Sequence, residues 1–136
     1  MLSMAKETSA LIWYKNDDAL LDKSAGSAHT QPQLRTGYNS TAATILDAEY
    51  KVTEGTTFPE GSFIVKELWQ DGAIDRWAML WKQPANEYAD ANGWVWGYID
   101  GDETIAEPAK NKGEICISCH SQAGNIDMTL MNLYFP

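Results

Sequence analysis

The sequence predicts an α+β fold, in which a mainly antiparallel β-sheet carries a few helices packed on it. Three observations lead to this class. Apolar residues at helical spacing lie near the N-terminus, three strand-like runs separated by turn signals fill the centre, and a short motif of cysteines and histidine follows near the C-terminus. A chain of 136 residues fits a single domain, 1–136, whose residues 1–28 form an N-terminal helix and loop.

The first third of the chain predicts short elements joined by a loop. A helix is expected from Met4 to about Asn16, because its apolar residues are compatible with one helical face. The stretch 22–33 is rich in glycine, serine and proline and is typical of a loop. A strand is expected over 34–38, and the segment 40–46 resembles a short capped helix.

The centre of the chain predicts three sequential antiparallel strands. The turn signal Phe58-Pro59-Glu60-Gly61 opens a β-branched and aromatic run over 62–69. Asp71-Gly72 is a hairpin signal, which makes 76–82 the returning strand. After a polar loop, a third strand spans 94–100 and ends at another Asp-Gly pair.

Aromatic residues are dense in these strands and predict an aromatic core. Alternation along a strand places side chains on one face in two groups of three, namely Trp77, Met79 and Trp81, and Trp94, Trp96 and Tyr98. We expect most of these rings to pack in the core and one or two to form the wall of a cofactor pocket.

The run Cys116-Ile117-Ser118-Cys119-His120 is a C-x-x-C-H haem attachment motif. Thiols at this spacing add to the vinyl groups of one porphyrin, and the adjacent imidazole then coordinates the iron. A zinc site would lack its remaining ligands, and a redox C-x-x-C normally lies between a strand and a helix of a βαβ unit. The motif therefore predicts one covalent haem c, with a chance thiol pair or a disulfide loop as the alternative.

The charge of the chain restricts its partners and its compartment. The formal net charge is −9, which argues against nucleic acid and anionic membranes and would favour a basic redox protein. No segment is long and apolar enough for a signal peptide or for membrane insertion. Because haem c is normally attached outside the bacterial cytoplasmic membrane, we expect a periplasmic protein whose export signal has been removed or replaced.

Lys66 lies between two aliphatic residues on one face of the predicted strand. Ile64, Lys66 and Leu68 share that face, whereas Val65 and Glu67 point the other way. A lysine on an apolar face is costly unless its ammonium extends to water, pairs with a carboxylate or is chemically modified.

Several segments together resemble the cytochrome P-460 family. They are F-P-E-G-S-F-I-V-K-E-L over 58–68, the Gly93-Trp94 pair, and C-x-x-C-H followed by Asp127-Met128. The resemblance covers roughly residues 30 to 136. It implies a periplasmic haem c protein of mainly antiparallel β fold that binds nitric oxide or oxidises hydroxylamine at a five-coordinate iron. It also implies a bond from Lys66 to the porphyrin.

On the distal side, the chain departs from the hydroxylamine-oxidising members of this family. Their distal carboxylate corresponds to Ala78, so the base is missing and enzymatic turnover is left open. An apolar distal side resembles that of the related cytochrome c′-beta proteins, which bind diatomic gases. Arg35 matches an arginine that reaches the distal side in the family, where it could bind a propionate or a nitrogen oxide; the alternative is a solvated arginine at a strand edge.

Two other functions remain open from the sequence. A six-coordinate electron-transfer cytochrome would use His29 or a methionine, Met79, Met128 or Met131, as its second axial ligand. A haem-based gas sensor would bind its ligand without turnover. The expected partners are therefore a small diatomic or nitrogenous ligand, a redox protein and, as one oligomeric state, a second copy of the chain.

Overall fold

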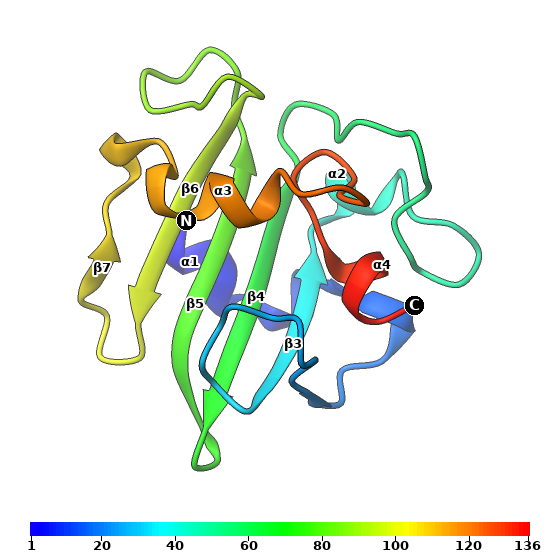
Figure 1. The fold of residues 1–136 in the computed structure, drawn as a ribbon, viewed down its shortest axis with the longest axis vertical. Helices are drawn as coiled ribbons and strands as arrows, with labels where there is room; N and C mark the ends of the chain where they lie inside the picture. The colour runs from blue at the N-terminus through cyan, green and yellow to red at the C-terminus, as the bar shows by residue number, and fades with distance from the viewer.

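The computed structural model describes residues 1–136, and its main feature is one seven-stranded antiparallel sheet (Figure 1). The strand order is β1-β3-β4-β5-β6-β7, and the short strand β2 also pairs with β3. The predicted α+β class with its antiparallel sheet is confirmed. None of the helices has the length and apolar character needed to cross a bilayer.

The elements have the following bounds. The strands are β1 (Ile12–Trp13), β2 (Leu21–Asp22), β3 (Gln33–Tyr38), β4 (Phe63–Gln70), β5 (Ala73–Lys82), β6 (Trp94–Asp100) and β7 (Ile105–Glu107). The α-helices are α1 (Leu2–Lys6), α2 (Ser40–Ala43), α3 (Glu114–His120) and α4 (Met131–Tyr134), and the 3₁₀ turns are η1 (Thr8–Ala10), η2 (Tyr14–Asn16) and η3 (Ala109–Asn111).

The central hairpin forms where the sequence predicts it. Asp71 and Gly72 both adopt positive φ, 52° and 78°, as the two-residue turn between β4 and β5 requires. β5 continues antiparallel to β6, so Lys66, Ala78 and Tyr98 are neighbours across three strands. All three predicted central strands are confirmed.

The N-terminal segment differs from its prediction. The helix ends at Lys6 rather than near Asn16, because Ile12 and Trp13 pair with Tyr38 and Gly37 of β3. This pairing satisfies backbone groups at the edge of β3, and a continuous helix from Met4 to Asn16 would leave those groups without a strand partner. The short strands β2 and β7 were likewise not predicted, since two or three residues carry no measurable alternation.

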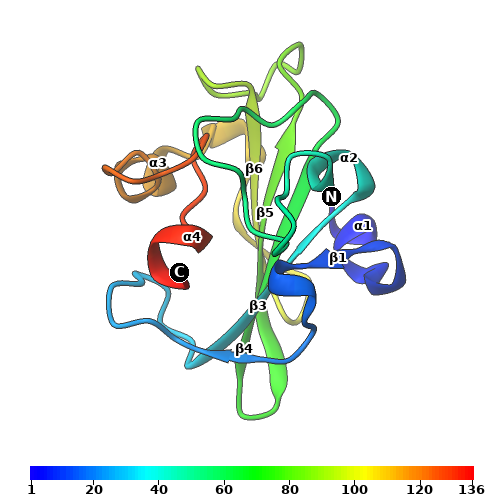
Figure 2. The ribbon, with the colours of Figure 1, turned by 90° about the vertical axis from the view of Figure 1, so that its right-hand side faces the viewer.

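The two faces of the sheet carry separate hydrophobic cores. One core lies on the side of α3 and α4, and the other lies beneath α1 (Figure 2). The α3-side core includes Leu34, Tyr38, Ile64, Leu68, Leu80, Trp94 and Trp96, whereas the α1-side core consists of Ala5, Leu11, Phe63, Val65, Trp77 and Met79. The two predicted aromatic groups therefore lie on opposite faces of the sheet.

The expectation of a distal Arg35 is wrong. Arg35 lies on the α1 side, where its Nε donates to Oε2 of the fully buried Glu67 at 2.6 Å and its guanidinium stacks 4.2 Å from the Trp13 ring. Alternation along β3 is the reason, because Leu34 and Thr36 face the α3 side and Arg35 must face away. Nor is it a solvated edge residue, since it neutralises a buried carboxylate.

We expect Arg35→Ala to destabilise the fold by about 3 kcal/mol, because it leaves the Glu67 carboxylate buried without a cation. Chemical denaturation measures this loss. Arg35→Leu combined with Glu67→Leu should recover most of it, and haem content should stay unchanged in both proteins. If Arg35→Ala lost haem while its stability stayed unchanged, Arg35 would have to act at the cofactor site.

Candidate functional site

An apolar cavity of about 220 Å³ lies between the sheet and helix α3. Thirteen of the twenty residues that line it are hydrophobic, so its interior favours a largely apolar group. The cavity brings together six of the residues singled out in the sequence: His29, Lys66, Ala78, Cys116, Cys119 and His120. Arg35 does not line it.

Helix α3 presents the C-x-x-C-H motif to the cavity. It begins after Gly113, whose φ is 70° and whose hypothetical Cβ would lie 2.5 Å from the Trp96 ring, so only glycine allows the helix to start here. Cys116 is half-buried, Cys119 is exposed, and neither forms a disulfide. Burial, followed by the nearby Glu107 and Cys119, raises the pKa of the Cys116 thiol to about 11. Cys116 is therefore a protonated thiol at neutral pH, and both sulfurs are free of any disulfide.

The His120 ring is held in one orientation. Its Nδ1–H donates to the Met128 carbonyl oxygen at 2.7 Å, and the Trp96 ring packs edge-on against it at 5.0 Å. Burial lowers the pKa of His120, partly opposed by the Met128 hydrogen bond, and Lys66 lowers it further. The ring is thus a neutral imidazole whose proton is on Nδ1 and whose Nε2 lone pair is free, which is the form that binds a metal.

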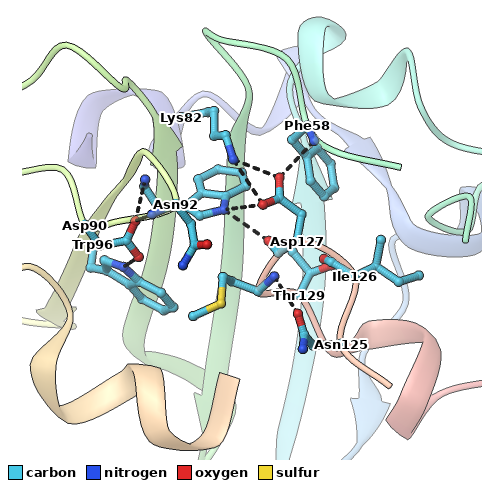
Figure 3. A network of polar contacts seen from close by, with 11 residues as sticks. Phe58, Lys82, Asp90, Asn92, Trp96, Asn125, Ile126, Asp127 and Thr129 are labelled. Carbon is cyan, nitrogen blue, oxygen red and sulfur yellow. Dashed lines mark hydrogen bonds and ion pairs between the residues drawn. The ribbon is translucent and has the colours of Figure 1, made fainter. Parts of the chain in front are cut away.

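The turn after α3 fixes the Met128 carbonyl (Figure 3). Asn125 Oδ1 accepts from the Met128 backbone N–H at 2.9 Å, and Ile126 and Thr129 bridge across the turn. Asp127 and Met128 both adopt positive φ, 44° and 70°, which is costly for residues other than glycine. Such a conformation persists only where its surroundings impose it.

Asp127 supplies that constraint. Its carboxylate accepts from Lys82 Nζ at 2.9 and 3.0 Å and from the Phe58 backbone N–H at 2.9 Å. The Trp94 indole N–H donates to the Asp127 carbonyl at 3.0 Å. The Lys82 and Asp127 side chains are only 7% and 9% exposed, so this is a buried ion pair (Figure 3). Sequence reasoning did not identify this ion pair, because the two residues lie far apart along the chain.

Asp90 fixes the aromatic wall beside His120. Its carboxylate accepts from the Trp96 indole N–H at 2.9 Å and from the Trp94 backbone N–H at 2.9 Å. Figure 3 shows the Asp90 side chain beside the Trp96 indole. Trp96 is therefore held against the His120 ring by a loop that precedes β6. The prediction that one or two rings of the aromatic group line the pocket is confirmed by Trp96 and Tyr98.

Lys66 points into the cavity, as its place in the strand predicts. It is half-buried and forms no hydrogen bond or ion pair, and burial lowers its pKa to about 8. Its neighbour across β5 is Ala78, which also lines the cavity. The one carboxylate in the lining is Glu107 of β7, whose Oε1 accepts from Asn111 at 2.9 Å. Sequence reasoning did not identify Glu107, because β7 was not predicted.

The methionines have three different positions. Met131 lines the cavity, and its sulfur accepts from the Thr36 hydroxyl at 3.2 Å. Met79 belongs mainly to the α1-side core while also reaching the cavity wall. Met128 acts through its backbone carbonyl and does not line the cavity. Of the three, Met131 is the methionine best placed to approach a bound group.

A family model described as Cytochrome P460 matches residues 21–131 of the chain. The chain belongs to the cytochrome P460 family. A search of curated proteins finds no match. Membership of the cytochrome P460 family implies a haem cofactor, and the cavity fits one: two free thiols and an imidazole with a free Nε2 line the same apolar space. Cys116, Cys119 and His120 are the residues that could hold it.

Replacing Asp127 should weaken both the fold and the site. We expect Asp127→Ala to lower the free energy of unfolding by about 3 kcal/mol, because Lys82 is then left buried without a carboxylate. The Met128 carbonyl would lose its fixed position, so the fraction of chains carrying haem should fall as well. Denaturation curves and the haem-to-protein ratio measure these effects.

Glu49→Ala is the matched control, since Glu49 pairs with Lys51 at the surface. It should change stability by less than about 0.5 kcal/mol. Full haem loading with an unshifted ferric spectrum in Asp127→Ala would show that the Met128 carbonyl needs no support from the ion pair.

Proposed function

We propose that this chain is a periplasmic protein with one covalent haem c, which binds nitric oxide or a related small nitrogen species at an open axial position. Cys116 and Cys119 are the attachment sites, and His120 is the proximal ligand. The observation that carries the proposal is that these three residues line one apolar cavity, with the Nε2 of His120 free. A haem bound there supplies an iron that takes up diatomic ligands.

The residues of the chain set the conditions for ligand binding. Met128 fixes the orientation of His120 and raises its basicity through the hydrogen bond at Nδ1. The hydrophobic lining excludes water and disfavours charged ligands. A small uncharged molecule such as nitric oxide suits this environment.

Binding is favoured over hydroxylamine oxidation by the position of Ala78. A general base beside the substrate typically contributes about 10² to 10⁴-fold to a proton-transfer step, and alanine supplies none. Glu107 is the only carboxylate in the lining, and it lies on β7 rather than at the Ala78 position on β5. Slow turnover of hydroxylamine is therefore expected.

An electron-transfer cytochrome is the second candidate, and a specific observation favours it. His29 and Met131 both line the cavity, so each offers an atom that could close the second axial position. The net charge of −9 would also favour a basic redox partner. If His29 or Met131 occupied that position, nitric oxide could not bind. Binding of nitric oxide therefore distinguishes the open-site protein from the electron-transfer cytochrome.

Absorption spectra of the purified haem protein test the proposal. We expect a high-spin ferrous form that takes up nitric oxide, because the proposal leaves His120 as the only protein ligand of the iron. A low-spin ferrous form with sharp α and β bands that ignores nitric oxide would establish the electron carrier. His29→Ala and Met131→Ala would then identify which residue closes the site.

A bond from Lys66 to the porphyrin is the second testable element of the proposal. Forming it exchanges one N–H and one C–H for an N–C bond, and the two electrons and two protons pass to an external oxidant such as dioxygen or a peroxide. The amine must be neutral to react. Because burial lowers its pKa to about 8, half of the amine is neutral near pH 8, and the neutral fraction keeps rising above that pH before it levels off.

Proteolysis of the haem protein should then yield one haem peptide that joins the Lys66 strand to the Cys116 segment. Lys66→Met should abolish this link and shift the absorption to that of ordinary haem c, while Lys23→Met, in the loop before β3, should leave both unchanged. Haem recovered on the Cys116 segment alone would show that Lys66 stays free, and the open-site proposal would stand without the bond.

A further inference from the structure

We propose that Tyr98 holds His29 as a hydrogen-bond donor to a ligand in the cavity, so that His29 stabilises the bound ligand and does not coordinate the iron. The inference rests on the proposed function, since it concerns the same cavity. Its ligand class is small molecules whose outer atom gains negative charge when they bind, such as carbon monoxide, nitric oxide or dioxygen.

His29 reaches the cavity from the loop between β2 and β3. This loop and helix α3 cover the same face of the sheet from opposite ends (Figure 1). His29 is half-buried and lines the cavity together with His120. The loop is anchored next to it, because the buried Gln31 donates to Asp75 at 2.7 Å and Lys23 N–H donates to the Pro32 carbonyl at 2.8 Å. These two hydrogen bonds hold the loop in place before and after His29.

The hydrogen bond between His29 and Tyr98 has a definite direction. His29 Nδ1 lies 3.2 Å from the Tyr98 hydroxyl oxygen. Nδ1 is the only protein atom within hydrogen-bond distance of that hydroxyl that can accept its hydrogen, and we assign the hydroxyl as the donor.

The charge of Arg76 favours the same direction. Its guanidinium lies 4.6 Å from the Tyr98 ring and is anchored to Asp100 by a hydrogen bond of 2.5 Å. The positive charge favours a hydroxyl whose lone pairs turn toward Arg76 and whose hydrogen turns away from it.

This direction fixes the tautomer of His29. A neutral imidazole has one N–H, and when Nδ1 accepts, the hydrogen is on Nε2. Burial, followed by the positive charges of Lys66, His120, Arg76 and Lys23, lowers the pKa of His29 to about 3, so the ring stays neutral at physiological pH. An Nε2 that carries hydrogen has no lone pair for iron.

The Nε2–H of His29 has no partner in the structure, although the ring lines the cavity. A ligand bound in the cavity would accept this hydrogen bond. Glu107, the neighbour of Tyr98 across β6 and β7, makes no hydrogen bond to His29, and its Oε1 accepts from Asn111 instead. The hydrogen bond should therefore strengthen ligand binding and slow ligand release.

The C–O stretching frequency of the ferrous carbon monoxide complex, measured on the complete haem protein, tests this inference. A donor near the ligand oxygen lowers the frequency. We expect His29→Ala to raise it and to speed ligand dissociation about two- to tenfold, as the loss of one hydrogen bond predicts. His29→Gln should restore much of the effect, because its amide also donates.

Tyr98 acts as a positioning residue, and Tyr98→Phe tests that role separately. It should move the frequency part of the way toward that of His29→Ala, while Tyr88→Phe, in the polar loop between β5 and β6, should leave it unchanged. Equal frequencies in the parent protein, His29→Ala and Tyr98→Phe would overturn the inference. So would a low-spin ferrous parent that becomes high-spin in His29→Ala, since His29 would then be the iron ligand.

The outcome is separable from that of the proposed function. A protein that binds carbon monoxide and nitric oxide with no response to His29 substitution retains an open site and loses only the role of His29. A protein that binds neither gas, in the parent form and in His29→Ala alike, contradicts the open site itself.

Discussion

The buried ion pair between Lys82 and Asp127 is the interaction on which the geometry of the site depends. It ties the last residue of β5 to the turn after α3 and keeps Asp127 and Met128 in a costly backbone conformation. In that conformation the Met128 carbonyl meets the His120 Nδ1–H. A buried pair contributes little net stability by itself, so its function here is best understood as positioning. The ion pair thereby fixes the position of helix α3, which carries His120, relative to the sheet.

Strand alternation separates two kinds of polar group in the same sheet. Lys66 and the neutral His29 lie on the α3 side without a compensating carboxylate beside them, whereas Arg35 and Glu67 neutralise each other on the α1 side. Lys66 and Glu67, which are adjacent in β4, therefore face opposite sides of the sheet and differ in their partners. Glu67 is part of a closed structural unit, and Lys66 is left available for whatever occupies the cavity.

The sequence predicts those features that depend on local pattern. The central strands, the Asp71-Gly72 turn and the inward Lys66 follow from alternation and turn chemistry, and the C-x-x-C-H residues follow from motif spacing. Features that depend on contacts between distant segments were missed, as Asp127 and the edge strands show. Arg35 was misplaced because a family resemblance gives a position along the chain, whereas one residue of strand register decides which face it occupies.

The cavity is lined by reactive and polar groups, each with an atom that is not bonded to other parts of the chain. Two thiols are unbonded, His120 has a free Nε2, Lys66 has no ion partner, and His29 has a free N–H. All of these groups line one apolar cavity and are available to a group that binds there. Haem with a small ligand would engage all of them, because it offers vinyl groups, a metal, a ring edge and a polar ligand atom. The positions of these groups are therefore those expected of a haem-binding cavity in a member of the cytochrome P460 family.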